Sequence, residues 1–200
     1  MAGLPVCQPD PPELEDAEDV ADVTLEPGGA VCFEAARLQR VEFGDGDYPN
    51  LALTDLELTD CDLANVQARG ATLKRAHLEA ARLVGWICTE AQLRHVTFAG
   101  CAADLASFGA TRLDVVAFRD CRLRGADFSD ASLRDVTFER CDLTGADFTG
   151  ASCRGVTLRD CTLDALRGIK GLRGATLTRP DIVGLAVQLA AALGIAAFDP

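Results

Sequence analysis

The most regular feature of the chain is an apolar residue at every fifth position from Phe33 to Leu163. All 27 positions of this series are apolar, and 14 of them are Leu and eight are Phe. A second series, two positions earlier and beginning at Val31, consists almost entirely of Ala, Val and Cys. Because alternate side chains of an extended strand point the same way, the large and the small residue of each five face one interior.

The other three positions of each five are rich in Asp, Arg, Thr, Ser and Gly, which suit solvent and tight turns. Five residues therefore form one side and one corner, and four sides close a coil of 20 residues. The longer period is also visible by itself, since residues 118–137 match residues 138–157 at twelve positions. We expect an all-β solenoid of about seven coils over residues 31–165, on the order of 33 Å long.

Cysteines follow the longer period at five positions: Cys61, Cys101, Cys121, Cys141 and Cys161. This spacing fits neither a zinc site nor a redox pair, and the length and N-terminus of the chain are wrong for a small secreted disulfide framework. We expect these cysteines in the small interior column, where they pack as small apolar side chains. Trp86 is also expected in the core, because Cys88 two positions later is small and keeps the layer filled.

The segments Ala126–Asp130, Cys141–Gly145 and Ala146–Gly150 resemble the pentapeptide-repeat family, whose pattern is a small residue, a polar residue, Leu or Phe and two variable residues. The resemblance covers residues 31–165 and implies a right-handed quadrilateral β-helix. Because no insertion interrupts the repeats, the chain is closest in form to the loop-free mycobacterial-type members that modulate DNA gyrase. Known members of the family mimic DNA in the DNA-binding saddle of gyrase, inhibiting it or protecting it from quinolones and gyrase toxins.

Both ends of the chain change character. Residues 1–19 are predicted to be a flexible arm, because the first 30 residues hold five prolines and eight acidic residues but no basic one. The β-helix is expected over residues 20–177, including a partial first coil and a degenerate closing turn. An open solenoid needs such caps, since its ends expose unpaired backbone.

Residues 178–200 predict a C-terminal helix and a tail. Thr178 is a plausible N-cap, Pro180 suits the first turn and Gly194 suits the C-terminal end. This helix is apolar over so much of its circumference that it must bury more than one side. The resemblance implies a homodimer that pairs two chains end to end, whereas the alternative is a cap in a monomer. The expected dimer interface consists of Ile182, Leu185, Ala186, Leu189 and Leu193.

The formal net charge is −12, to which the first 30 residues contribute −8, residues 31–165 contribute −6 and residues 166–200 contribute +2. This balance disfavours direct binding to nucleic acid, and a DNA segment of the same length would carry roughly 20 negative charges. Any DNA mimicry must therefore be confined to part of the surface. One side of the coil is richer in base: Lys74, Arg75, Arg94, Arg112, Arg134 and Arg154. Another is acidic and is the expected partner-binding face: Asp47, Glu90, Asp127, Asp130 and Asp147.

Nothing in the sequence indicates catalysis. A filled solenoid offers no natural cavity, and the only histidines, His77 and His95, occupy outward positions. We therefore predict no catalytic, cofactor or metal site, no small-molecule substrate and no membrane contact, and we place the chain in the cytoplasm. Two hypotheses remain: a modulator of DNA gyrase acting through the acidic side, or a protein-protein interaction scaffold with another partner.

Overall fold

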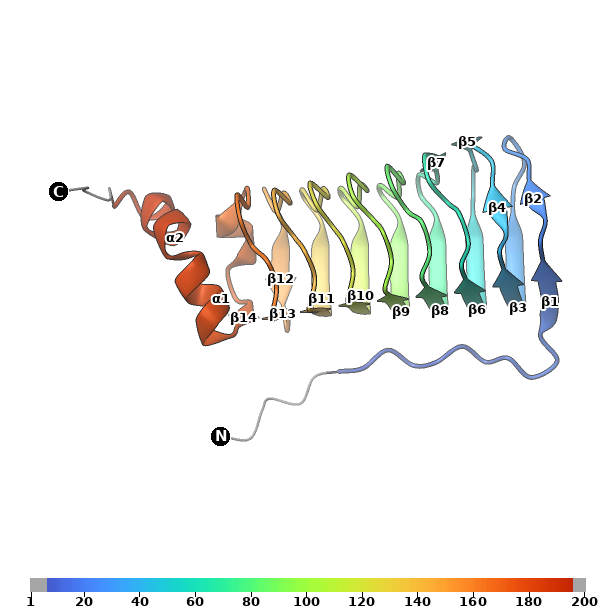
Figure 1. Cartoon of the computed structure of the whole chain (residues 1–200), viewed down its shortest axis with the longest axis horizontal. Coiled ribbons are helices and arrows are strands. Elements are labelled where there is room, and N and C mark those ends of the chain that lie inside the picture. The colour runs from blue at the N-terminus through green and yellow to red at the C-terminus, as the bar shows by residue number, and fades with distance from the viewer. Residues whose placement is uncertain (1–6, 196–200) are drawn as a thin grey trace.

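Successive coils of the chain pair in parallel with a register of 20 residues. Leu53 lies opposite Phe33 in the coil before it and opposite Leu73 in the coil after it, and the same step continues to Cys153. The computed structural model, which describes residues 7–195, is a right-handed quadrilateral β-helix of about eight turns (Figure 1). The predicted fold class is confirmed, and partial coils at the ends raise the expected number of turns from about seven to about eight.

The four sides of a coil are named here after the large apolar residue at the centre of each side. The first side is centred on the column that starts at Phe33, the second on Leu38, the third on Phe43 and the fourth on Tyr48. One sheet covers the first two sides. Its strands are β1 (Glu18–Ala21), β3 (Cys32–Gln39), β6 (Ala52–Thr59), β8 (Thr72–Glu79), β9 (Gln92–Ala99), β10 (Arg112–Arg119), β11 (Ser132–Glu139), β12 (Ser152–Arg154), β13 (Thr157–Arg159) and β14 (Thr176–Leu177).

The third and fourth sides have much shorter ladders. They contain the paired strands β2 (Thr24–Leu25) with β4 (Glu42–Phe43) and β5 (Gly46–Asp47) with β7 (Val66–Gln67), and in later coils they contain single bridges. The corner after each of these sides is a β-turn: the backbone N–H of Ala126 donates to the Leu123 carbonyl at 3.1 Å, and that of Ala131 donates to the Phe128 carbonyl at 3.2 Å. The corners after the first and second sides are instead open bends of the main sheet.

Corner residues adopt left-handed backbone conformations. In the corner between the first two sides, for example, φ is 49° at Ala35, 54° at Asp55 and 54° at His95. Glycine, Asn and Asp tolerate this conformation best, which explains why these residues are frequent at the corners. The left-handed residues recur at intervals of five, which agrees with the expectation that five residues form one side and one corner.

Side chains of the large and the small columns fill the interior. The phenyl rings of Phe108, Phe128 and Phe148 stack nearly parallel, with centroids 5.1 and 5.0 Å apart. Trp86 is fully buried, as expected. The cysteine column also lies inside, with four of its five members buried and Cys161 half-buried.

The N-terminal end of the rod is closed by a shorter coil. β1 pairs with β3 after 18 residues rather than 20, so the first coil is tighter than the rest. Pro27 occupies the space beside Gly46, where a Cβ atom would lie only 2.9 Å from the proline ring. The buried Tyr48 hydroxyl donates to the carbonyl of Leu25 at 2.7 Å, which ties this end coil to the regular ones.

The C-terminal end is closed by a 3₁₀ turn, η1 (Ile169–Leu172), and by two short helices, α1 (Arg179–Gly184) and α2 (Ala186–Ala192). Thr178 is the N-cap of α1, as predicted, and Gly194 is left-handed with φ of 76°. The predicted single helix is interrupted at Leu185, next to Gly184, which is a poor helix former. The rest of the expected tail, residues 196–200, lies outside the described residues.

The segment before β1 runs back along the rod (Figure 1). The sequence predicts a flexible arm here, and its residues 1–6 lie outside the described residues. From Gln8 to Leu14, however, the segment follows a defined extended course, because side chains of several coils bind it. We call Gln8–Leu14 the docked segment.

Candidate functional site

The acids of the expected partner-binding face lie on the fourth side of the β-helix and at the corner that follows it. Glu90 and Asp130 occupy that corner, with φ of 57° and 55°. The other three lie in one ladder, whose rungs are Asp47, Gln67, Ile87, Ser107, Asp127, Asp147 and Arg167. The fold therefore brings Asp127, Asp130 and Asp147 together as an acidic patch, whereas Asp47 lies four rungs from Asp127 and Glu90 lies two coils before Asp130.

Hydrogen bonds within the turns fix two carboxylates of the acidic patch. Asp127 Oδ1 accepts from the backbone N–H of Ser129 at 2.8 Å, and its Oδ2 accepts from the Ser107 hydroxyl at 3.1 Å. Asp147 Oδ1 accepts from the backbone N–H of Thr149 at 2.8 Å. Hydrogen bonding to Thr149 lowers the pKa of Asp147. Asp127 and Asp147 of the patch are therefore held in set orientations.

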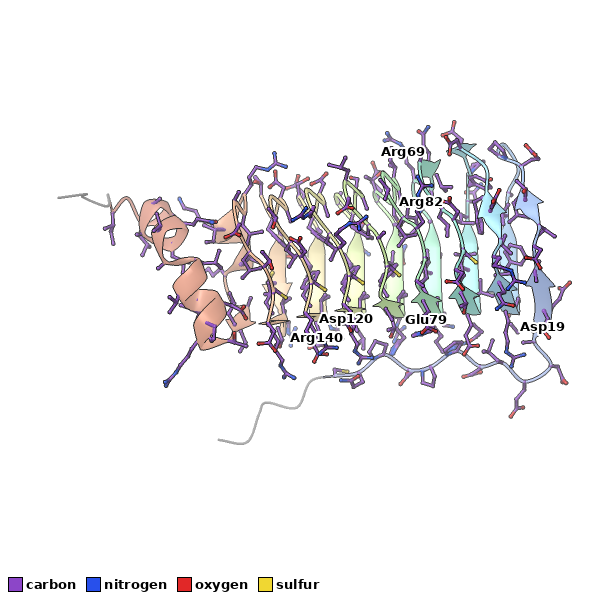
Figure 2. All side chains as sticks on the ribbon, viewed as in Figure 1. Asp19, Arg69, Glu79, Arg82, Asp120 and Arg140 are labelled. Carbon is purple, nitrogen blue, oxygen red and sulfur yellow. The ribbon has the colours of Figure 1, made fainter. Side chains whose placement is uncertain are left out.

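Acids on the other sides are more often neutralised by arginines of adjacent coils. Figure 2 shows one such pair, Asp120 and Arg140, on neighbouring coils. Similar pairs join Arg82 to Asp62 at 2.7 Å and Arg124 to Asp142 at 2.6 Å. Within residues 7–195, no basic side chain forms an ion pair with Glu90, Asp127 or Asp130, although Asp147 lies 3.5 Å from Arg167.

The basic side is less uniform than its composition indicates. One ladder of the first side runs through Lys74, Arg94, Asp114, Arg134 and Arg154. The Asp114 carboxylate sits between Arg94, at 3.7 Å, and Arg134, at 3.3 Å. Part of this positive charge is therefore balanced within the side itself.

The residues of the expected dimer interface do not all lie on one surface. Leu185 is buried. The Asp181 carboxylate accepts hydrogen bonds from the backbone N–H groups of Asp160 and Cys161, both at 3.2 Å, which fixes the start of α1 to the last coil. Ala186 is exposed outside the groove that the helices form with the end of the rod. This groove has a volume of about 580 Å³, and its lining includes Ile182, Leu185, Leu189 and Leu193 from the helices and Ile169, Leu172 and Leu177 from the rod.

The apolar surface of the helices is broader than the predicted interface. Val183 and Val187, on the side of the helices away from the groove, are 74% and 69% exposed, and Leu193 is 78% exposed. Isolated apolar residues on a surface are ordinary, but several together on one short element indicate a contact surface. The end of the molecule is therefore apolar on two sides.

The sequence of the coils matches a family model. The model for the pentapeptide repeat region matches residues 71–148 and 121–167. The chain is a pentapeptide-repeat protein. No curated protein sequence matches this pentapeptide-repeat chain.

Solved structures of other pentapeptide-repeat proteins resemble the chain. Full-length QnrB1, a plasmid-mediated fluoroquinolone resistance protein, is 16% identical over 88% of this chain and 100% of that chain, with a TM-score of 0.37. A protein from the thylakoid lumen of Arabidopsis thaliana is 21% identical over 53% and 69%, with a TM-score of 0.26. HetL from the cyanobacterium Nostoc sp. strain PCC 7120 is 16% identical over 78% and 86%, with a TM-score of 0.22. These TM-scores are too low to transfer a function to the pentapeptide-repeat chain.

Reactive groups of the pentapeptide-repeat coils are mostly shielded. Burial raises the pKa of Cys88 well above its usual range and the pKa of Cys153 to about 11, so both remain thiols at neutral pH. No three His, Cys, Asp or Glu side chains within residues 7–195 are grouped so that they could hold a metal ion. Over the same residues, no helix has the length and apolarity needed to cross a membrane.

Sequence reasoning missed a second surface, on the corner between the first and second sides. Arg75 and His95 contact the docked segment at this corner, and Arg119 contacts it at the far end of the second side. The available signal was the cluster Pro9, Pro11 and Pro12 within an acidic segment, but nothing local indicates which of the four corners it meets.

Proposed function

We propose that this pentapeptide-repeat protein is a non-catalytic scaffold that binds a protein partner and works as a homodimer. The observation that supports this proposal best is the contrast in burial between the apolar residues of the coils and the apolar residues of the C-terminal helices. Those of the large and small columns of the regular coils are almost entirely buried, whereas Val183, Val187 and Leu193 are 74%, 69% and 78% exposed. Surface of this kind at the end of a rod favours association with a second protein chain.

A twofold dimer through the C-terminal helices covers this surface most simply. Around a twofold axis the same patch meets its own copy, so one apolar helix supplies both halves of the interface. Ile182 and Leu189 then line the groove of their own chain, while Val183, Val187 and the exposed part of Leu193 face the second copy. Ala186 lies between them and lets the two backbones approach closely. Such a dimer places the two rods end to end and leaves all four sides of each rod available to other partners.

Sedimentation velocity on the full chain tests the dimer. We expect the wild-type chain to sediment as a dimer and the Val187→Asp variant as a monomer, because a charge in the apolar interface is costly to bury. Leu105→Asp is the matched control, since Leu105 is also 69% exposed but lies at a corner of the coils, and this variant should remain dimeric. A monomeric wild-type chain, or an unchanged dimer of Val187→Asp, contradicts the proposed assembly.

The more specific proposal is that the partner is DNA gyrase, which the chain engages through the acidic patch in competition with DNA. Two features support it: the repeats are free of insertions, as in the gyrase-modulating members that the sequence resembles, and Asp127 and Asp130 are free of ion pairs within the described residues. The modest charge of the coils restricts any mimicry of DNA to this patch, rather than to the whole rod. The alternative is a scaffold whose partner is another protein.

A supercoiling assay with the cognate gyrase, with and without a fluoroquinolone, separates these alternatives. The test variant combines Asp127→Asn, Asp130→Asn and Asp147→Asn, because Asn removes the charge while its amide oxygen can still accept the turn hydrogen bonds. The control combines Asp62→Asn, Asp120→Asn and Asp142→Asn, whose acids are paired with arginines. We expect the wild type and the control to alter gyrase activity and the test variant to lose that effect. No effect of the wild type in large excess over gyrase refutes gyrase as the partner.

A further inference from the structure

The docked segment runs along one corner of the β-helix, opposite to the direction in which the coils follow one another (Figure 1). The backbone N–H of Glu13 donates to Asp55 Oδ1 at 3.0 Å, and the backbone N–H of Asp10 donates to His95 Nδ1 at 3.1 Å. Gln8 lies further along, where its side chain contacts Arg119 of β10. This segment of seven residues therefore contacts side chains on several successive coils.

The spacing of these contacts defines the conformation of the segment. Asp55 and His95 are two coils apart in the same corner column, which corresponds to roughly 10 Å at the usual strand spacing. The three-residue step from Asp10 to Glu13 covers that distance at about 3.2 Å per residue, close to the rise of a polyproline II helix. Pro9, Pro11 and Pro12 favour this conformation, so the segment loses little conformational freedom on docking.

Burial shows that the docked corner differs from the others. Val115 occupies this corner and is only 7% exposed, whereas Leu105, at the corner between the third and fourth sides, is 69% exposed. The outward-facing Thr97 and Ala117 of the second side are also buried, at 9% and 2%. These positions point outward from the coil, and Thr97 lines a cavity together with residues 9–12 of the docked segment, so we attribute their burial to this segment.

The docked segment leaves room beneath it. A cavity of about 270 Å³ lies between its residues 9–12 and the second side, where His77, Thr97 and Arg119 contribute to the lining. We call this surface, from Asp55 to Arg119 at the corner and on the second side, the corner groove. Prolines offer no donors to such polar neighbours, so a different peptide in the same place can make hydrogen bonds that the docked segment does not make.

Side chains of the coils, rather than a backbone ladder, hold the docked segment. Within the described residues, no backbone-to-backbone hydrogen bond joins residues 8–14 to the coils. Besides the two hydrogen bonds to Asp55 and His95, Arg75 lies 3.8 Å from Glu13 and Arg37 donates to the carbonyl of Leu14 at 3.4 Å. Such an occupant can leave without disturbing the sheet, whereas removing a strand would break a ladder.

We propose that the corner groove binds an extended, acidic, proline-containing peptide of a protein partner, and that the docked segment is an intramolecular occupant which this peptide displaces. The chemistry of the occupant defines the partner. Its prolines pre-form the extended backbone, its acids Glu13 and Asp10 lie beside Arg75 and His95, and its amides at a spacing of three residues meet Asp55 and His95. This site is separate from the acidic patch and from the C-terminal helices, and it does not depend on gyrase as a partner.

The first test measures binding of a fluorescein-labelled synthetic peptide of residues 8–16 to the full chain by fluorescence anisotropy. The tethered segment competes at an effective concentration on the order of millimolar, so the wild type should bind the peptide weakly. The variant Asp10→Lys with Glu13→Lys keeps the groove intact but places a positive charge beside Arg75 and removes the carboxylate that lies 3.2 Å from His95 Nδ1, which weakens the tethered segment. This variant should bind the peptide at least tenfold more tightly. Equal binding by the two chains, or none by either, overturns the proposal.

A groove variant shows whether the gain in binding belongs to this corner. Adding His95→Ala to the double variant should weaken peptide binding at least tenfold, because the acceptor for the Asp10 amide is lost. Alanine fits the left-handed conformation, since Ala35 adopts it in the same column, and circular dichroism confirms that the coils remain folded. Arg140→Ala at another open corner is the matched control and should leave binding unchanged. Binding that survives His95→Ala, or that is lost in the control, overturns the assignment to this groove.

Hydrogen exchange of the wild-type chain tests the docked state directly. The amides of Asp10 and Glu13 should exchange more slowly than in the free peptide of residues 8–16, and the double lysine variant should lose this protection. Exchange of both amides at the rate of the free peptide in the wild type overturns the proposal, because the segment then does not occupy the groove.

Discussion

The regular coils and the C-terminal helices use apolar residues in opposite ways. In the coils, each Phe or Leu packs on an equivalent residue of the coil before and the coil after it, so the repeat supplies its own core. The helices have no further coil to pack on, and only Leu185 of their large apolar residues is buried. The difference shows that the repeat ends at a surface that remains apolar, and that each coil is stabilised by packing its interior side chains on those of its neighbours.

The largest effect should follow from opening a cavity within the coils. Phe128 is fully buried between Phe108 and Phe148, and Phe128→Ala should lower the free energy of unfolding by about 3–5 kcal/mol. Urea denaturation followed by circular dichroism measures this change. A loss below about 1 kcal/mol would mean that adjacent coils collapse into the cavity, and the strict packing described for the coils would then be wrong.

A smaller effect should separate the two faces of the helices. Leu185→Ala removes a buried side chain and should lower the free energy of unfolding by about 2–3 kcal/mol. Val187→Ala changes an exposed residue and should alter the stability of the isolated chain by less than about 0.5 kcal/mol. Denaturation at a concentration where the chain is monomeric compares the two variants. Equal losses would contradict the difference in burial between these residues.

The smallest effect on stability is expected for Asp55, at the corner under the docked segment. Hydrogen bonding to Arg75 holds the pKa of the Asp55 carboxyl below its ordinary value of 3.8, so the folded state favours the ionised form. This stabilisation is present above about pH 3.8 and is lost as the pH falls below that value. Asp55→Asn should lower the free energy of unfolding at neutral pH by about 1–2 kcal/mol.

Denaturation of this variant at neutral pH and near pH 3 measures the acid dependence, with Asn keeping the left-handed backbone that Asp55 adopts. The variant should lose less stability than the wild type between the two pH values. The control Glu79→Gln, at an exposed position, should follow the wild type at both. An acid dependence of Asp55→Asn equal to that of the wild type would contradict a lowered pKa at this position.

The coils could be read from the sequence because their determinants are local. A large apolar residue at position three of each five, such as Leu53, a small one at position one, such as Ala71, and a corner residue such as Asp55 define one side without knowledge of the rest. Thr178 could be placed as an N-cap for the same reason, since the residues that cap a helix are adjacent in the chain.

Other features depend on contacts that the sequence does not record. Asp10 and His95 are 85 residues apart, and all four corners offer left-handed polar residues, so no local pattern selects the corner on which the segment docks. The five acids were predicted to form one face of the coil. Asp127, Asp130 and Asp147 cluster because they lie in neighbouring coils, whereas Asp47 and Glu90 lie in earlier coils of the rod. The contacts that fix α1 to the last coil join Asp181 to Asp160 and Cys161, which lie at least 20 residues earlier in the chain.

The register of 20 residues sets how this molecule can change in evolution. Residues 118–137 and 138–157 are near copies of each other, and each makes one complete coil. Duplicating or deleting such a unit leaves every corner and every column in place, so selection can alter the length of the rod without redesigning its cross-section. The corner groove and the C-terminal helices would then move apart or together in steps of about 4.8 Å. Duplication or deletion of such units therefore changes the length of the rod only by whole coils.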